Sequence, residues 1–154
     1  MLRYTPMPSA IAASFRRGEP DAYGMVPERH TSDGQGMPCR HCLKNIAAGD
    51  NYLILAYRPF PALQPYAETG PIFLHAEECP AYEEEAVPPI LTTSRDYLLR
   101  GYSRDDRIVY GTGAVTPVDE LAGKAADILG LDEVAYVHVR SARNNCYQCR
   151  IDAA

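Results

Sequence analysis

The sequence of 154 residues lacks tryptophan, long apolar runs and an excess of basic residues. No stretch approaches the ~20 consecutive apolar residues of a transmembrane helix, so a helical membrane protein is not expected. The formal net charge is -5. A broad nucleic-acid-binding surface is not expected either, because such a surface neutralises phosphates with a basic excess, and Arg140, Arg143 and Arg150 form only a local exception.

No secretion signal is expected at the amino end. The apolar stretch 7–15 is interrupted by Pro8 and Ser9, and two arginines follow it directly, which makes a poor signal peptide. We therefore expect a cytoplasmic protein, in which thiols stay mostly reduced. In that compartment the five cysteines are expected to be metal ligands or buried apolar residues rather than a disulfide framework.

The length predicts one domain over residues 1–154, large enough to bury an ordinary hydrophobic core. The sequence shows no internal repeat and no linker. Strands are predicted over residues 51–57, 71–75, 96–102, 107–115, 134–140 and 146–152. Hairpins outnumber strand-helix-strand alternations, so the expected fold is α+β, a mainly antiparallel sheet with one principal helix and long Pro/Gly-rich loops.

The principal helix is predicted between Thr116 and Gly130. Thr116 can cap it, Pro117 suits its first position, and apolar residues recur on one face as far as Gly130. A shorter helix is predicted over residues 8–17. Residues 18–38 are rich in Gly, Pro, Asp and Ser, which predicts a long loop.

The strongest chemical signal comes from five cysteines and one histidine. They form three elements: Cys39/Cys42, Cys146/Cys149 and His75-x-x-x-Cys79. Six candidate ligands with no cysteine left over predict a zinc site, because Zn²⁺ binds thiolates and imidazole in a tetrahedral set of four.

Spacing decides which of these residues can share an ion. Residues four apart on a strand are ~13 Å from each other, too far for bonds of about 2.0–2.3 Å, whereas on a turn they are neighbours. His75 and Cys79 can therefore share an ion only if the chain leaves its strand at His75 and turns. Cys39 and Cys42 also need a turn, which Pro38 and the loop around Gly49 favour.

The preferred ligand set is therefore Cys39, Cys42, His75 and Cys79. The strand pattern over residues 146–151 competes with a turn, so Cys146 and Cys149 either lie adjacent to the site or substitute for part of the set. The leading hypothesis is a non-catalytic zinc-binding domain, in which the ion joins the loop after residue 38 to the region after His75 or to the final strand. The sequence does not tell which partner or substrate the protein has.

An enzymatic alternative comes from two short motifs. Residues 38–42 match P-C-x-x-C, and residues 75–77 match H-x-E, the two halves of the zinc deaminase signature. The alternative is a zinc-dependent hydrolase of deaminase-like chemistry with Glu77 as the catalytic residue. Against it, the two motifs stand in reversed order, and Cys79 threatens the open coordination position that activates water.

A third hypothesis is a thiol redox protein, in which one C-x-x-C pair forms a reversible disulfide. Neither pair opens a helix after a strand, as a thioredoxin-like pair does. Two other histidines are interpreted more simply. His41 is expected in a solvated turn, near enough to the first pair to contact a ligand, and His138 is expected to be a structural strand residue with satisfied hydrogen bonds.

Much of the chain also carries a family pattern. It comprises Pro38–Arg40, Asn51–Tyr57, Pro65–Glu68 with Ile72–Phe73, Ala135–His138 and Asn145–Asp152. These segments resemble a family of small bacterial proteins that is catalogued as domain of unknown function 1203. The family brings no known activity.

The resemblance bears on the metal site, because members of that family commonly have a single cysteine in place of each C-x-x-C pair. Those cysteines match Cys39 and Cys146. The other candidate ligands have no counterparts there, so the sequence resembles a cysteine-rich branch. The resemblance implies a fold that does not depend on metal, and it suggests that Cys39 and Cys146 lie close in space. It thereby makes a second ligand set a rival: Cys39, Cys42, Cys146 and Cys149.

Overall fold

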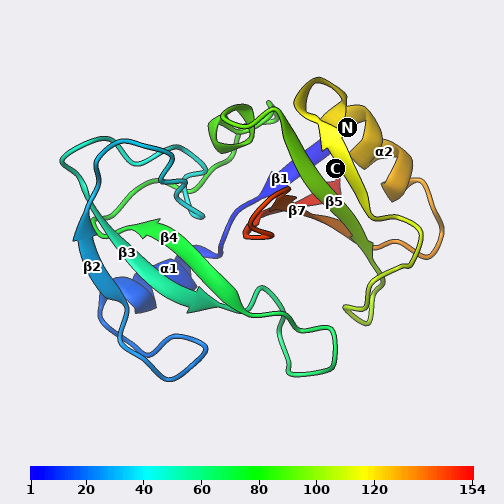
Figure 1. Cartoon of the computed structure of the whole chain (residues 1–154). Helices are drawn as coiled ribbons and strands as arrows, with labels where there is room; N and C mark the ends of the chain where they lie inside the picture. Colours follow the sequence, from blue (N-terminus) through cyan, green and yellow to red (C-terminus); the bar gives the residue numbers. More distant parts are fainter.

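Two antiparallel β-sheets lie next to each other in the computed structural model, which describes all of residues 1–154 (Figure 1). The elements in chain order are β1 (Leu2–Thr5), α1 (Ser9–Arg16), β2 (Glu28–Thr31), β3 (Asn51–Tyr57), β4 (Gly70–His75), η1 (Pro89–Thr92), β5 (Asp96–Tyr102), β6 (Ala114–Pro117), η2 (Val118–Glu120), α2 (Leu121–Leu129), β7 (Tyr136–Ser141) and β8 (Tyr147–Ala153). This arrangement confirms the predicted α+β class with antiparallel pairing. Neither α-helix has the length and apolarity that crossing a membrane requires.

The larger sheet has the strand order β1-β8-β7-β5-β6. Alternate side chains of its strands, such as Leu99, Val137 and Val139, are fully buried on one face. Helix α2 covers that face and packs against β5, β7 and β8. Gly101 permits this close approach, because a Cβ atom there would lie 2.9 Å from Ile128 Cγ2.

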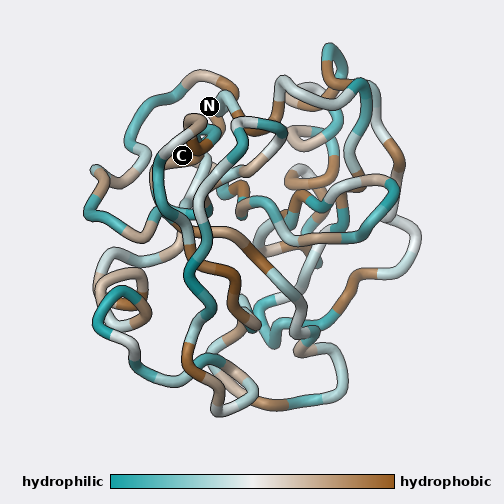
Figure 2. Tube along the Cα trace, turned by 60° about the vertical axis from the view of Figure 1, so that its left-hand side comes forward, coloured by the Kyte–Doolittle hydropathy of each residue, from teal (hydrophilic) through white to brown (hydrophobic).

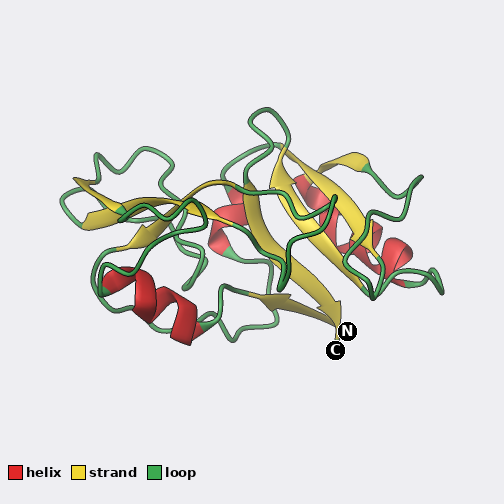
Figure 3. Cartoon of the chain, turned by 90° about the horizontal axis from the view of Figure 1, so that it is seen from below, coloured by secondary structure: helices red, strands yellow, loops and turns green.

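The smaller sheet has the order β2-β3-β4 and is covered by α1 (Figure 3). Phe15 and Ala12 of α1 are buried against apolar residues of β3 and β4 in a second core cluster. The apolar stretches of the chain, coloured brown in Figure 2, run mainly through the middle of the molecule. Arg40 links the two sheets, since its Nε donates a hydrogen bond of 2.7 Å to the carbonyl oxygen of Tyr147 on β8.

Several local predictions were wrong at the edges of the sheets. The loop predicted over residues 18–38 contains β2, whose four residues are all exposed, so strand pairing with β3 had no apolar pattern to reveal it. Strand β1 was not predicted either. The strand expected over residues 107–115 is reduced to β6, with a single isolated bridge between Tyr102 and Ile108.

The start of the principal helix was also placed too early. Thr116 belongs to β6, where it pairs with Tyr97, and its Oγ1 donates to the carbonyl oxygen of Ala114 rather than accepting from the helix. The turn η2 follows, and α2 begins only at Leu121. The predicted end at Gly130 is confirmed, because Gly130 is the C-terminal cap of α2.

Candidate metal centre

Two separate segments bring four potential ligands together. These residues, which we call the Cys/His cluster, are Cys39, Cys42, His75 and Cys79. Each offers one sulfur or ring nitrogen atom, and these four atoms all lie within 4.8 Å of one another. The Cys39 and Cys42 side chains are buried, and those of His75 and Cys79 are half-buried. The cluster can hold a metal ion.

A tight turn places the first two sulfur atoms on the same side. The amide of Leu43 donates to the carbonyl oxygen of Cys39 at 3.0 Å, and the amide of Cys39 donates to that of Lys44, also at 3.0 Å. Leu43 completes the turn with a φ of 52°, in the left-handed region. The turn that this pair needed is therefore present.

Leu43 also connects this turn to the other sheet. Its side chain is fully buried in the core cluster of the larger sheet, whereas Cys39 and Cys42 belong to the core cluster of the smaller one. The amide of Ile90 donates to the carbonyl oxygen of Leu43 at 3.1 Å. The turn therefore lies where the two cores meet.

The other two potential ligands come from the end of β4. The strand ends at His75, and the chain bends at residues 76–77 before it reaches Cys79. This is the departure from the strand that the spacing of His75 and Cys79 required. The bend brings Cys79 Sγ to 3.9 Å from Cys39 Sγ.

The interatomic distances suit a tetrahedral ion. Bonds of about 2.3 Å to sulfur and about 2.0 Å to nitrogen give tetrahedral edges of roughly 3.8 Å between two sulfurs and roughly 3.5 Å between sulfur and nitrogen. Cys39 Sγ and Cys79 Sγ are 3.9 Å apart, and Cys42 Sγ and His75 Nδ1 are 3.4 Å apart. An ion of this size fits between them with small movements of the side chains.

Groups around the cluster donate hydrogen bonds to its sulfur atoms. Arg16 Nη2, on α1, donates to Cys79 Sγ at 3.0 Å, and the same guanidinium donates through Nε to the carbonyl oxygen of His75 at 3.0 Å. The amide of His75 donates to Cys39 Sγ at 3.4 Å. Such contacts stabilise negatively charged sulfur and orient the ligands.

His41 forms a further contact with Cys79. Its Nδ1 lies 3.3 Å from Cys79 Sγ, and its Nε2 lies 2.8 Å from Ser9 Oγ. Burial, followed by the charge of Arg16, lowers the pKa of His41, which favours a neutral ring that donates to the sulfur and accepts from the serine. The expectation of a solvated His41 was wrong, because the side chain is buried between α1 and the cluster.

Proximity of the ligands shifts their acidity. Hydrogen bonds with Cys42 and Cys79 lower the pKa of the Cys39 thiol, because they stabilise its thiolate. The hydrogen bond with Cys39 raises the pKa of Cys42, because the Cys42 thiol keeps the proton that it donates. Hydrogen bonds to Cys39 and Cys79 raise the pKa of His75 to about 10. Binding a divalent cation would remove these protons, since metal ligands must be deprotonated.

The remaining predicted residues lie outside the Cys/His cluster. Cys149 is fully buried in the core beneath α2, and Cys146 lies half-buried in the turn before β8, with Sγ 3.7 Å from the carbonyl oxygen of Asn144. The structure thus does not bring the rival set together. The Glu77 side chain is 73% exposed and pairs with Arg29 at 2.6 Å.

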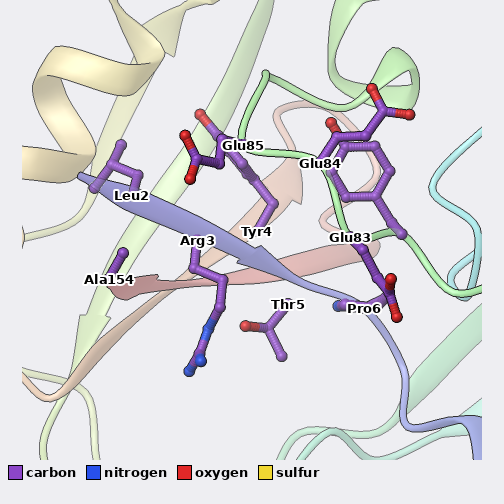
Figure 4. Close-up of a pocket in the computed structure, with 10 residues that line it drawn as sticks. Leu2, Arg3, Tyr4, Thr5, Pro6, Glu83, Glu84, Glu85 and Ala154 are labelled. Atoms are coloured by element: carbon purple, nitrogen blue, oxygen red, sulfur yellow. The ribbon is translucent and has the colours of Figure 1, made fainter.

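Two surface hollows complete the description. One of about 550 Å³ opens beside Cys79 and is lined in part by Arg16 and Arg17. The other, of about 570 Å³, follows the free edge of β1 opposite the acidic residues 83–85 and does not touch the cluster (Figure 4). Neither the guanidinium of Arg16 nor the hollow beside Cys79 was indicated by the sequence motifs.

Comparison with known proteins gives one match. A model of the family described as "Protein of unknown function (DUF1203)" matches residues 36–153. Neither the curated proteins nor the solved structures contain a match. The matched range includes the whole Cys/His cluster, whereas Ser9 and Arg16 precede it.

Proposed function

This chain belongs to the DUF1203 family of proteins of unknown function, and from the geometry of its Cys/His cluster we propose that it is a zinc-binding protein with a structural, non-catalytic ion. The observation that carries the proposal is the convergence of four ligand atoms within 4.8 Å of one another. Three sulfurs and one imidazole nitrogen form a donor set typical of structural zinc, while magnesium and calcium prefer oxygen ligands.

The completeness of the set supports a structural role. Catalytic zinc sites keep a coordination position for water, whereas four protein ligands fill a tetrahedral site. In the deaminase-like alternative, Cys79 would have to leave that position, and Glu77 would have to turn from Arg29 towards the ion. The observed contacts therefore favour the closed site.

The ion would join segments that are distant along the chain. It would connect the turn at residues 39–42 to the end of β4, and Arg16 would extend this connection to α1. Joining distant segments limits the freedom of the unfolded chain, so the ion would stabilise the fold. The family pattern implies that folding itself does not require the metal.

We also propose that residues 1–154 form one domain in the cytoplasm. The bond from Arg40 to the carbonyl oxygen of Tyr147 and the position of Leu43 support a shared core for the two sheets. All five cysteines are unpaired, which suits a reducing compartment.

The direct test is metal analysis of freshly purified protein under reducing conditions. We expect close to one equivalent of zinc, and less than about half an equivalent, with no gain on reconstitution, would contradict the proposal. X-ray absorption at the zinc edge should find three sulfurs at about 2.3 Å and one nitrogen at about 2.0 Å. The Cys146→Ser variant is the matched control, and loss of zinc from it would support the rival set instead.

A second candidate, a thiol redox protein, is favoured by the separation of 3.9 Å between Cys39 Sγ and Cys79 Sγ. Removal of two electrons and two protons by a disulfide oxidant would join these atoms covalently. Thiol titration distinguishes the two functions. Slow labelling of the cluster that accelerates after chelation supports zinc, whereas rapid loss of two thiols in a reversible oxidation supports redox chemistry.

A further inference from the structure

Polar groups without partners gather on one face of the larger sheet. Six buried polar side-chain atoms in the structure have no hydrogen-bond partner, and five of them belong to Arg100, Tyr102, His138 and Arg140. These residues alternate along the neighbouring strands β5 and β7, on the face opposite α2, and Arg100 pairs directly with His138. One of the five atoms, Arg140 Nη2, is compensated by an ion pair with Glu68 at 3.1 Å.

His138 is the most unusual member of this face. It is 1% exposed, and its Nδ1 has no partner. Four aromatic rings surround it with centroids at 4.7–5.1 Å, those of Phe60, Tyr102, Tyr136 and Tyr147. The expectation that its hydrogen bonds are satisfied was therefore wrong. A buried polar group without a partner is destabilising, which points to a role outside the fold itself.

A pocket of about 360 Å³ reaches this histidine from the surface between the two sheets. We call it the His138 pocket. Its walls come from β1, from the start of α1, from the segment that follows β3, and from β7 and β8. The volume falls within the range of small-molecule binding sites.

Charges in the His138 pocket are predominantly positive. Three arginines, Arg3, Arg58 and Arg150, line it together with one carboxylate, Asp152. Arg3 leaves β1 on the side opposite Tyr4, which faces the core (Figure 4). The pocket thus has a surplus of two positive charges in a protein whose net charge is -5.

The arginines differ in whether they already form an ion pair with a carboxylate of the protein. Arg150 donates to Asp152 Oδ1 at 2.7 Å, and Asp152 is also bonded by Thr5 at 2.7 Å. Arg58 donates only to the carbonyl oxygen of Phe60, at 3.3 Å, and so has no carboxylate partner. An anionic ligand would form an ion pair with Arg58 and would accept a second hydrogen bond from Arg150, which already donates to Asp152.

The remaining walls are flat and apolar. Pro59, Pro61 and Phe60 contribute to them, together with Tyr57 at the end of β3 and Tyr147 at the start of β8. Proline and aromatic rings contact planar ligands over a large area without losing many rotamers. The polar and apolar parts of the pocket therefore indicate a ligand with an acidic end and a planar body.

We propose that the His138 pocket binds a small aromatic anion, a carboxylate or a phosphate ester. The acidic group contacts Arg58 and Arg150, the planar body lies against the proline and tyrosine walls, and a polar atom of the ligand bonds to His138. This site is separate from the Cys/His cluster, so the inference does not depend on the metal.

The test uses the purified full-length protein with phenyl phosphate and benzoate as probes. Calorimetry should give a Kd below about 1 mM for at least one probe. Phenol and inorganic phosphate, which each lack one half of the ligand, should bind more than about tenfold more weakly, because each loses one class of contact. The ring signals of His138 in NMR spectra should shift on addition of the tighter probe and stay in place with benzylamine.

Three variants test the assignment of the residues. Arg58→Gln should weaken binding about tenfold, since it removes a charge-assisted contact and only one internal hydrogen bond. His138→Phe, which keeps the ring packing, should weaken binding severalfold. The control is Arg95→Gln, because Arg95 is 83% exposed and does not line the pocket, and its affinity should equal that of the wild type.

The proposal is overturned if neither phenyl phosphate nor benzoate binds at a concentration of about 10 mM, ten times the highest Kd expected. Equal affinity for phenol, inorganic phosphate or benzylamine would also overturn it, as would equal weakening by Arg58→Gln and Arg95→Gln. NMR chemical-shift dispersion checks that each variant is folded. Should His138→Phe unfold, Arg58→Gln alone decides, because Arg58 is not part of the core.

Discussion

The Cys/His cluster is one partly buried group of polar side chains, and the other is the His138 face, which consists of Arg100, Tyr102, His138 and Arg140. Their atoms are arranged differently. In the Cys/His cluster the ligand atoms point to one another, and all four lie within 4.8 Å. On the His138 face the polar atoms stay apart, and several have no partner. Convergence at bonding distance suits a single ion, whereas separated polar groups around a pocket suit a molecule.

The two regions also differ in the element that carries them. The Cys/His cluster is built from a turn, a strand end and a bend, which let the side chains approach a common point. The His138 face is built from adjacent strands, where pairing holds side chains about 5 Å apart. Regular strands can thus line a binding surface, but they do not easily provide four ligands for one ion.

The largest effect on either region is expected from Cys39→Ser. Cys39 Sγ contacts Cys79 Sγ and the amide of His75, so its loss removes a ligand and the centre of the cluster. We expect zinc affinity to fall by more than about a hundredfold, which exceeds the effect of replacing a residue that only contacts a ligand. Competition with a chromophoric chelator measures it. Affinity equal to that of the Cys146→Ser control would show that Cys39 is not a ligand.

Metal removal from the wild type should affect one region more than the other. After chelation, we expect amide hydrogen exchange to accelerate more than about tenfold at Leu43 and His75, whose N–H groups bond to Cys39. The amides of Val137 and Val139, in the centre of the larger sheet, should keep their protection. Equal acceleration in both regions would mean that the ion holds the whole fold together.

Arg16→Gln should have an intermediate effect. It removes the charged donor to Cys79 Sγ while all four ligands remain. Loss of such a contact should lower zinc affinity about 10- to 100-fold. Arg17→Gln is the matched control, because Arg17 is the next residue and pairs with Glu19 at the surface. Identical affinities of the two variants would remove Arg16 from the metal centre.

The smallest effect is expected from the pH dependence of His138. Burial, followed by the charge of Arg140, lowers the pKa of His138 well below its usual value. Below pH about 6.5 the unfolded chain therefore binds a proton that the folded protein does not, and stability falls as the pH falls, by up to about 1.4 kcal/mol per pH unit. Urea unfolding of wild type and His138→Phe measures this, and parallel pH profiles would contradict it.

The sequence predicted well those features that depend on neighbouring residues. The apolar segment 51–57 coincides with β3, and the spacing of His75 and Cys79 correctly required a bend after the strand. It could not reveal β2, whose exposed residues gain their strand conformation from pairing with β3 alone. Thr116 shows a similar limit, because a good capping residue was recruited into β6 by its pairing with Tyr97.

Contacts between distant segments were beyond prediction from motifs. Arg16 lies 63 residues before Cys79, and only the packing of α1 on the smaller sheet brings them together. The strand pattern located His138 and favoured an ordinary structural residue. Its Nδ1 has no hydrogen-bond partner because aromatic rings from three other segments surround the imidazole, and the sequence could not show this. The candidate ligands could be named from local chemistry, whereas the groups that surround each site could not.

The conformation of Leu43 imposes opposing demands on a single position. Its left-handed backbone would suit glycine, while its place in the core requires a large apolar side chain. Neither residue type satisfies both demands, so this position is a compromise between a relaxed cysteine turn and a filled interior. A change in the shape of that turn would therefore move the Leu43 side chain and disturb the core packing of the larger sheet.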